Sequence, residues 1–164
     1  LLKILSGQLR FTSGTMRWTG PGAQSLPPAA VLRTMGYCAP YLDLYPDLDC
    51  MENLRFINQL RAEPADEDHM RRALLETGFT RVPETLYRHL SSGQKQRARL
   101  AAAVFFEPPM LFLDEPGTNL DESGFERVAR LVQKRRMDGR LTVLASNSAL
   151  ELDLCESLIR LDTP

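Results

Sequence analysis

An apolar strand that ends in two adjacent acids constrains this chain more than any other feature. Residues Met110 to Leu113 form a continuous apolar run, as expected for a parallel strand covered on both faces, and Asp114 and Glu115 follow it directly. Ligands of open α/β sheets bind at the carboxyl ends of the strands. A carboxylate there can hold Mg²⁺ through its water shell, and a second can position or deprotonate an attacking water. Two solvated acids at a strand end are the simpler interpretation of this segment alone.

A second segment, upstream of the acids, has the composition of a helix that begins at a tight Ser/Gly turn. Leu90-Ser91-Ser92-Gly93-Gln94 precedes a run of good helix formers that extends to about Phe106. The free N–H groups and the positive dipole end of such a helix favour phosphate, and a serine hydroxyl can add a donor. Ser91 or Ser92 could equally be an ordinary N-cap, and the two roles are compatible.

These two segments, in this order and followed by Thr118-Asn119-Leu120-Asp121, resemble the signature motif, Walker B strand and D-loop of the ATP-binding-cassette (ABC) ATPases. The resemblance implies that the chain binds ATP and Mg²⁺, with Asp114 as the Mg²⁺-associated carboxylate and Glu115 as the catalytic one. In the family the signature motif closes over the γ-phosphate of an ATP bound by a partner cassette. The residues that would do so here are Ser91, Ser92, Gly93 and Gln94.

The same resemblance places Asp121 in the D-loop, which crosses the interface between two cassettes. Asn119 or Asp121 is also expected to cap the helix from Glu122 to Arg136. The segment Glu52 to Phe56 resembles the cytochrome c biogenesis haem-exporter branch of the family.

The family's phosphate loop, Gly-x-x-x-x-Gly-Lys-Ser/Thr, is absent from the sequence. The only lysines are Lys3, Lys95 and Lys134, and none of them follows a glycine. Leu1-Leu2-Lys3 is similar to the residues immediately after that loop. We therefore expect an N-terminal truncation, and we expect the chain as it stands to bind ATP poorly.

Two further positions depart from the family pattern. Pro40 occupies the place of the Q-loop glutamine after the strand Met35–Cys38, and it offers no side-chain ligand; Tyr41 or Asp43 could substitute. Asn147 occupies the place of the switch histidine. Asparagine can donate a hydrogen bond to a γ-phosphate but cannot take a proton, so Asn147 is a candidate catalytic residue that leaves the rate of hydrolysis in doubt.

The spacing of apolar residues predicts an α/β domain in which helices alternate with strands. Strands are expected at residues 15–18, 35–38, 110–113, 141–145 and 158–161. Helices are expected at residues 1–5, 50–60, 66–77, 92–106, 122–136 and 150–155. Residues 21–28 are expected to form a loop, and residues 39–49 an irregular exposed connection.

By resemblance, the fold is P-loop NTPase-like, with a mostly parallel sheet core and an inserted helical subdomain. We expect a single ABC ATPase domain fragment over residues 1–164. Residues 1–44 and 93–164 would form the α/β core, and residues 45–92 the helical subdomain that ends in the signature motif.

Composition excludes several classes of protein. A net charge of −1 and a pI near 6.2 give no sign of a nucleic-acid binder. No apolar run reaches the roughly 18–20 residues that a transmembrane helix needs. Three widely spaced cysteines are typical of a reduced, cytosolic protein.

The first functional hypothesis is an ATP-hydrolysing subunit of an ABC transporter. Two cassettes, identical or different, would sandwich MgATP and drive a transmembrane permease subunit from the cytoplasmic face of the membrane. The second is a degenerate cassette that binds ATP and acts as a regulatory or interaction module with little hydrolysis, which Pro40 and Asn147 favour and Glu115 opposes. A soluble ABC ATPase outside transport is a third, although such proteins usually carry long coiled-coil insertions or two cassettes.

Overall fold

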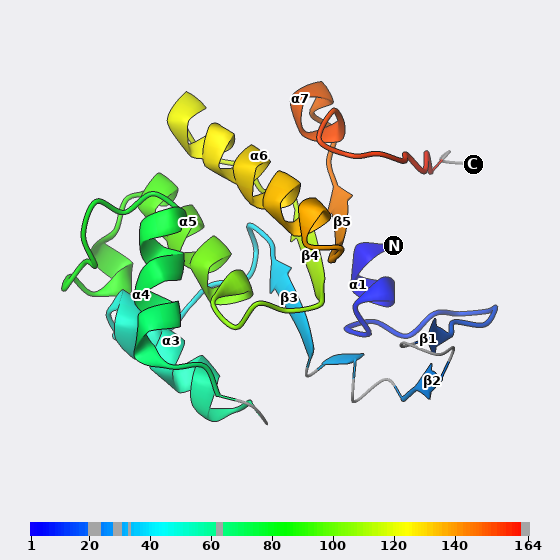
Figure 1. Cartoon of the computed structure of the whole chain (residues 1–164), viewed down its shortest axis with the longest axis horizontal. Helices are drawn as coiled ribbons and strands as arrows, with labels where there is room; N and C mark the ends of the chain where they lie inside the picture. Colours follow the sequence, from blue (N-terminus) through cyan, green and yellow to red (C-terminus); the bar gives the residue numbers. More distant parts are fainter. Residues whose placement is uncertain (20–23, 28–30, 33, 62–63, 162–164) are drawn as a thin grey trace.

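A three-stranded parallel sheet in the order β3–β4–β5 is the centre of the fold (Figure 1). The computed structural model describes residues 1–19, 24–27, 31–32, 34–61 and 64–161. The strands β3 (Met35–Cys38), β4 (Met110–Asp114) and β5 (Leu141–Ala145) confirm the predicted ranges to within one residue. The middle strand β4 is the most deeply buried, as its continuous apolar run predicts.

The two faces of β4 are covered by different parts of the chain. Leu111 and Leu113 belong to an apolar cluster with residues of α5 (Ser92–Val104) and α6 (Glu122–Met137). Phe112 points to the opposite face, where the Trp18 ring meets it edge-on at a centroid distance of 6.3 Å. This alternation follows from the two-residue period of a strand. Both faces of the strand that carries Asp114 are therefore packed.

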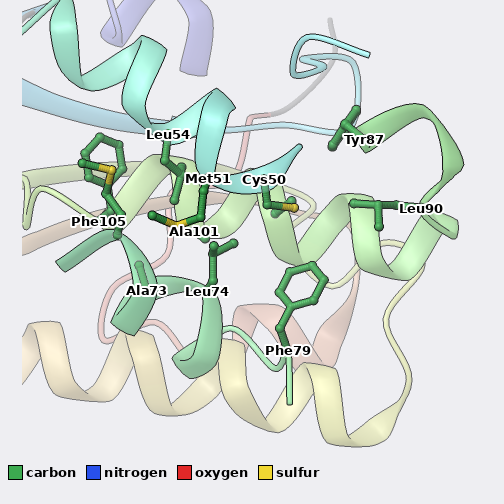
Figure 2. Packing of buried hydrophobic residues seen from close by; sticks show 12 residues of the cluster. Cys50, Met51, Leu54, Ala73, Leu74, Phe79, Tyr87, Leu90, Ala101 and Phe105 are labelled. Carbon is green, nitrogen blue, oxygen red and sulfur yellow. The ribbon is translucent and has the colours of Figure 1, made fainter. Parts of the chain in front are cut away.

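A helical block fills the crossover between β3 and β4. It consists of α3 (Cys50–Gln59), α4 (Glu67–Glu76) and the short 3-10 helix η2 (Tyr87–His89), and it packs on α5. Figure 2 shows Leu54 of α3, Leu74 of α4 and Ala101 of α5 converging in its core. The opposite side of α5 presents Leu100 to the sheet cluster, so this one helix joins the two cores.

The four long helices begin at capping residues that the sequence displays. Asp49 and Ser91 each form a capping box, with Glu52 and Gln94 respectively. Asp66 and Asp121 accept hydrogen bonds from backbone N–H groups of the first turns of α4 and α6. The predicted cap at Asp121 is confirmed, and α4 and α6 end shortly before Gly78 and Gly139, where φ is +112° and +67°.

The ends of the chain differ most from the predictions. Residues 158–161 form no strand; Leu158 and Ile159 are 55 % and 82 % exposed. The prediction of a strand from the mostly apolar segment Leu158–Leu161 was wrong because a strand needs a hydrogen-bonded neighbour, and within the described residues β5 pairs only with β4. The last helix, α7, covers Ala149–Leu152 and so is shorter than predicted.

The structure also corrects the elements predicted for the N-terminal region. α1 (Leu2–Leu5) is where it was expected, but β1 is Trp18–Thr19 rather than residues 15–18. β1 pairs antiparallel with β2 (Ser25–Leu26), which lies inside the predicted loop 21–28. Residues 21–23 and 28 of that loop lie outside the described residues. No helix in the described part of the chain is long and apolar enough to cross a membrane.

Candidate functional site

The carboxyl edge of the parallel sheet carries the two adjacent acids. Asp114 is the last residue of β4, half-buried, and lies opposite Ala145 of β5 in the strand register. Glu115 is exposed, and its N–H donates to the carbonyl oxygen of Ala145 at 2.9 Å. Its φ is +44°, in the left-handed region that residues other than glycine rarely adopt. Such strained backbone is common at functional sites.

Asn147 lies at the same edge, two residues beyond the end of β5. Its side chain is exposed. The neighbouring Ser146 hydroxyl accepts the N–H of Ser148 at 2.8 Å and so closes a tight turn around it. Because β4 and β5 are parallel neighbours, the topology brings Asn147 to the side of the sheet where Glu115 emerges.

The Ser/Gly turn at the start of α5 forms the second part of the site. Ser91 is the N-cap: its hydroxyl accepts the Gln94 N–H at 3.3 Å, and the Gln94 side chain accepts the Ser91 N–H at 2.9 Å. The ordinary capping role is therefore confirmed for Ser91. Ser91, Ser92 and Gln94 are exposed and Gly93 is half-buried, so this turn forms part of the surface.

The segment that ends in Asp121 packs directly against that turn. A Cβ atom added to Gly93 would lie 3.0 Å from the backbone oxygen of Asn119. Asn119 itself has a φ of +64°. Asp121 accepts from the Gly124 N–H at 3.0 Å and from the Arg97 guanidinium at 2.9 Å. The Gly124 N–H and then Arg97 hold the pKa of Asp121 below its ordinary value, so this exposed carboxylate is ionised.

The structure distinguishes the two side chains that could substitute at the Pro40 position. Partial removal of its hydroxyl from water, and hydrogen bonds to Tyr37 and Asp114, raise the pKa of Tyr41, whose hydroxyl lies 2.6 Å from that of Tyr37. The Tyr41 hydroxyl therefore reaches the acid at the end of β4. The Asp43 carboxylate instead accepts the Tyr87 hydroxyl.

The sequence analysis did not predict two buried polar residues of the site. Gln96 donates to the Pro116 carbonyl at 2.8 Å, and Glu151 accepts the Gly117 N–H at 2.7 Å. A signal for Gln96 existed, because it lies one helical turn after Gly93 on a helix with an apolar face. The short, mostly apolar segment around Glu151 gave no such signal.

The carboxylates at this edge of the sheet suit a Mg²⁺ ion that is also coordinated by the phosphates of a nucleotide. Within the described ranges, no group of three His, Cys, Asp or Glu side chains could hold a metal by itself. Mg²⁺ commonly keeps several waters and binds through one or two carboxylates plus substrate phosphates. Asp114, half-buried with a hydroxyl partner, is suited to that limited role.

Comparison with known proteins identifies the family of the chain. Residues 1–118 match the family model described as ABC transporter. A cytochrome c biogenesis ATP-binding export protein CcmA of Methylococcus capsulatus is 34 % identical over 152 residues, which cover 93 % of this chain and 73 % of the relative. CcmA 2 of Cupriavidus metallidurans is 30 % identical over 150 residues, covering 92 % and 71 %.

Solved structures support the same fold. The chain resembles the dimeric structure of MJ0796, a bacterial ABC transporter cassette, with a TM-score of 0.81 at 21 % identity over 94 % of this chain and 72 % of that one. A dimeric post-hydrolysis state of MJ0796 bound to ADP and Pi gives a TM-score of 0.79 at 21 % identity, covering 93 % and 69 %. At this identity the likeness establishes the α/β fold of a P-loop NTPase cassette.

Proposed function

The chain belongs to the ABC transporter ATP-binding family, and from this we propose that it is the ATP-hydrolysing subunit of a transporter. One observation supports hydrolysis above the others. Asp114 and Glu115 leave the central strand at the edge where the fold binds ligands, and Glu115 has a backbone conformation that residues other than glycine rarely adopt. The names of the relatives support an export role in cytochrome c biogenesis.

In this proposal the residues of the edge divide the chemistry of hydrolysis between them. Asp114 would hold Mg²⁺, which neutralises charge on the phosphates when it is bound. Glu115 would orient and deprotonate the attacking water. Asn147 would donate a hydrogen bond to the γ-phosphate, without the proton transfer that a histidine allows.

A second copy of the cassette, or a different one, completes the proposed site. Ser91, Ser92, Gly93 and Gln94 would contact the nucleotide of that partner through N–H groups, a hydroxyl and the positive end of the α5 dipole. The exposure of Ser91, Ser92 and Gln94 supports this arrangement, and so does the packing of the half-buried Gly93 against Asn119. Asp121, held by Arg97, would lie at the interface. The division of the chain into an α/β core of residues 1–44 and 93–164 and a helical subdomain of residues 45–92 stays a prediction.

A transmembrane permease is the second proposed partner. Apolar side chains are exposed along the segment after β3 and along α3: Tyr41, Leu42, Tyr45, Phe56 and Leu60, with exposed fractions from 37 % to 73 %. A largely apolar cavity of about 280 Å³ opens beside them, between β3, α3 and α5. Exposed apolar surface next to a cavity is typical of a protein interface. The subunit would sit at the cytoplasmic face of the membrane, bound through this surface.

The decisive experiment is MgATP turnover by the natural full-length protein, expressed with any residues that precede Leu1 in its gene. Glu115→Gln should lower kcat by about 10²-fold or more, since it removes the base and retains the shape. Glu122→Gln, an exposed acid on α6, is the matched control and should turn over normally. Turnover that survives Glu115→Gln would refute the assignment.

A regulatory cassette with little hydrolysis is the alternative function, and Asn147 favours it. Nucleotide binding without any turnover by the unaltered protein, with or without a permease, would establish this alternative. Turnover that depends on Glu115 would exclude it.

A further inference from the structure

Two buried polar side chains from different helices hold the turn that follows Glu115. Gln96 of α5 is fully buried, and its Nε2 donates to the carbonyl oxygen of Pro116 at 2.8 Å. Glu151 of α7 is 4 % exposed, and its Oε1 accepts the N–H of Gly117 at 2.7 Å. Consecutive residues of the turn are therefore fixed from two directions.

Glu151 approaches the turn so closely that a residue with a Cβ atom at position 117 would displace its carboxylate. A Cβ added to Gly117 would lie 2.6 Å from the Oε1 atom of Glu151 and 3.2 Å from Phe125. The preceding residue, Pro116, is buried and has no N–H, so its carbonyl is its single backbone polar group, and Gln96 satisfies it.

Each of the two side chains also keeps one buried atom without a hydrogen bond. Within the described residues, the Oε1 atom of Gln96 and the Oε2 atom of Glu151 have no partner. Burying an unsatisfied polar atom costs folding free energy, and native structures contain few such atoms. Apolar residues of similar size would instead leave the Pro116 carbonyl and the Gly117 N–H without these partners. The two side chains therefore satisfy the backbone of the turn although each keeps one unsatisfied atom of its own.

The backbone of Glu115 needs this support. Its φ of +44° is unfavourable for a residue with a side chain and persists only where the surroundings impose it. Its N–H is bonded to Ala145 and its carbonyl accepts the Thr118 N–H at 3.1 Å. The two residues between Glu115 and Thr118 are those that Gln96 and Glu151 hold.

We propose that Gln96 and Glu151 are positioning residues that fix the direction of the Glu115 carboxylate, and that Glu151 couples Glu115 to the segment bearing Asn147. Glu151 lies four residues after Asn147, at the other end of a short turn and helix. A movement of α7 therefore acts on both sides of the site at once. The inference rests on the proposed function for the role of Glu115.

The test compares three substitutions in the full-length protein. Glu151→Ala removes the acceptor, Glu151→Gln keeps an acceptor of the same shape, and Asp153→Ala changes an exposed residue just after α7. We expect kcat per folded molecule to fall about tenfold in Glu151→Ala while the Kd for ATP stays the same, because one hydrogen bond to the turn is lost. Glu151→Gln and Asp153→Ala should retain kcat within about twofold.

Two further readouts separate positioning from a merely structural role. Combined with Glu115→Gln, Glu151→Ala should have no further effect on the residual turnover, because both act through one carboxylate. The Gly117 amide should exchange with solvent faster in Glu151→Ala than in Glu151→Gln. Gln96→Leu, which keeps the volume and removes the donor, should likewise lower kcat without changing the Kd.

Unchanged kcat in Glu151→Ala, or an additive loss with Glu115→Gln, would overturn the inference. If the unaltered protein shows no turnover that depends on Glu115, the proposed function fails instead. The exchange of the Gly117 amide then decides by itself whether Glu151 anchors the turn.

Discussion

Replacing Asn53 by alanine should loosen the segment that follows β3. Asn53 is fully buried in α3, and its side chain makes four hydrogen bonds to that segment and the helix start. Its Oδ1 accepts the Tyr45 N–H at 2.8 Å, and its Nδ2 donates to the carbonyls of Tyr45 and Asp49 at 3.1 and 2.9 Å. At about 1 kcal/mol for each of these three bonds, the free energy of unfolding should fall by about 3 kcal/mol.

Asn58, on the same helix, supplies the matched control. It exchanges two hydrogen bonds of 2.7 and 2.8 Å with Ala65, at the far end of α3, so Asn58→Ala should cost about 2 kcal/mol. Urea unfolding measures both losses, and thermal unfolding should show a drop of roughly 6–12 °C for Asn53→Ala. Only that variant should expose the Tyr45 amide to hydrogen exchange.

The result also bears on the proposed permease surface, because Tyr45 belongs to it. Stimulation of turnover by the permease should weaken in Asn53→Ala and persist in Asn58→Ala at equal folded fraction. A destabilisation below about 1 kcal/mol, or a Tyr45 amide that stays protected in Asn53→Ala, would refute the argument that Asn53 organises this segment.

Two other substitutions and the chemistry of Cys38 test separate parts of the structure. Gly36→Ala would place a Cβ 2.1 Å from a backbone oxygen of α5, and should lower the free energy of unfolding by about 3 kcal/mol or more in urea titration; a loss below 1 kcal/mol would contradict the close packing. Asn147→His should raise kcat severalfold by restoring a side chain that can transfer a proton, whereas an unchanged rate would show that the position is not limiting. Burial raises the pKa of Cys38 from 9.0 to about 12, so iodoacetamide should alkylate Cys155 at least about tenfold faster than Cys38 in the native state, as mass spectrometry can measure. For the same reason the contribution of Cys38 to stability is complete below pH 9.0 and falls as the pH rises toward about 12.

Much of the local structure could be predicted because its causes lie within a few residues of chain. Helices begin at Asp49, Asp66, Ser91 and Asp121 because a side-chain oxygen accepts an N–H three residues later, which requires no distant partner. The strand Met110–Asp114 was equally visible, since an uninterrupted apolar run of this length is typical of a strand buried on both faces. Local causes of this kind also located the acids at the edge of the sheet.

Long-range contacts could not be predicted from the sequence, and the reason is equally physical. Leu158 to Leu161 is apolar except for Arg160, but strand formation depends on a neighbour whose position the segment itself does not encode. Whether Tyr41 or Asp43 meets the acid of β4 depended on the path of an irregular segment.

The sequence by itself determined the long helices with their caps, the three strands of the parallel sheet and the residue types of the candidate site. Each of these depends on chain spacing and on the chemistry of neighbouring residues. The tertiary structure alone decided which distant groups support Glu115. Gln96 and Glu151 lie 19 residues before it and 36 residues after it, and they meet its turn only because α5 and α7 pack beside the end of β4. A hydrogen bond between such distant residues is set by the fold as a whole, since no local preference of either residue specifies its partner.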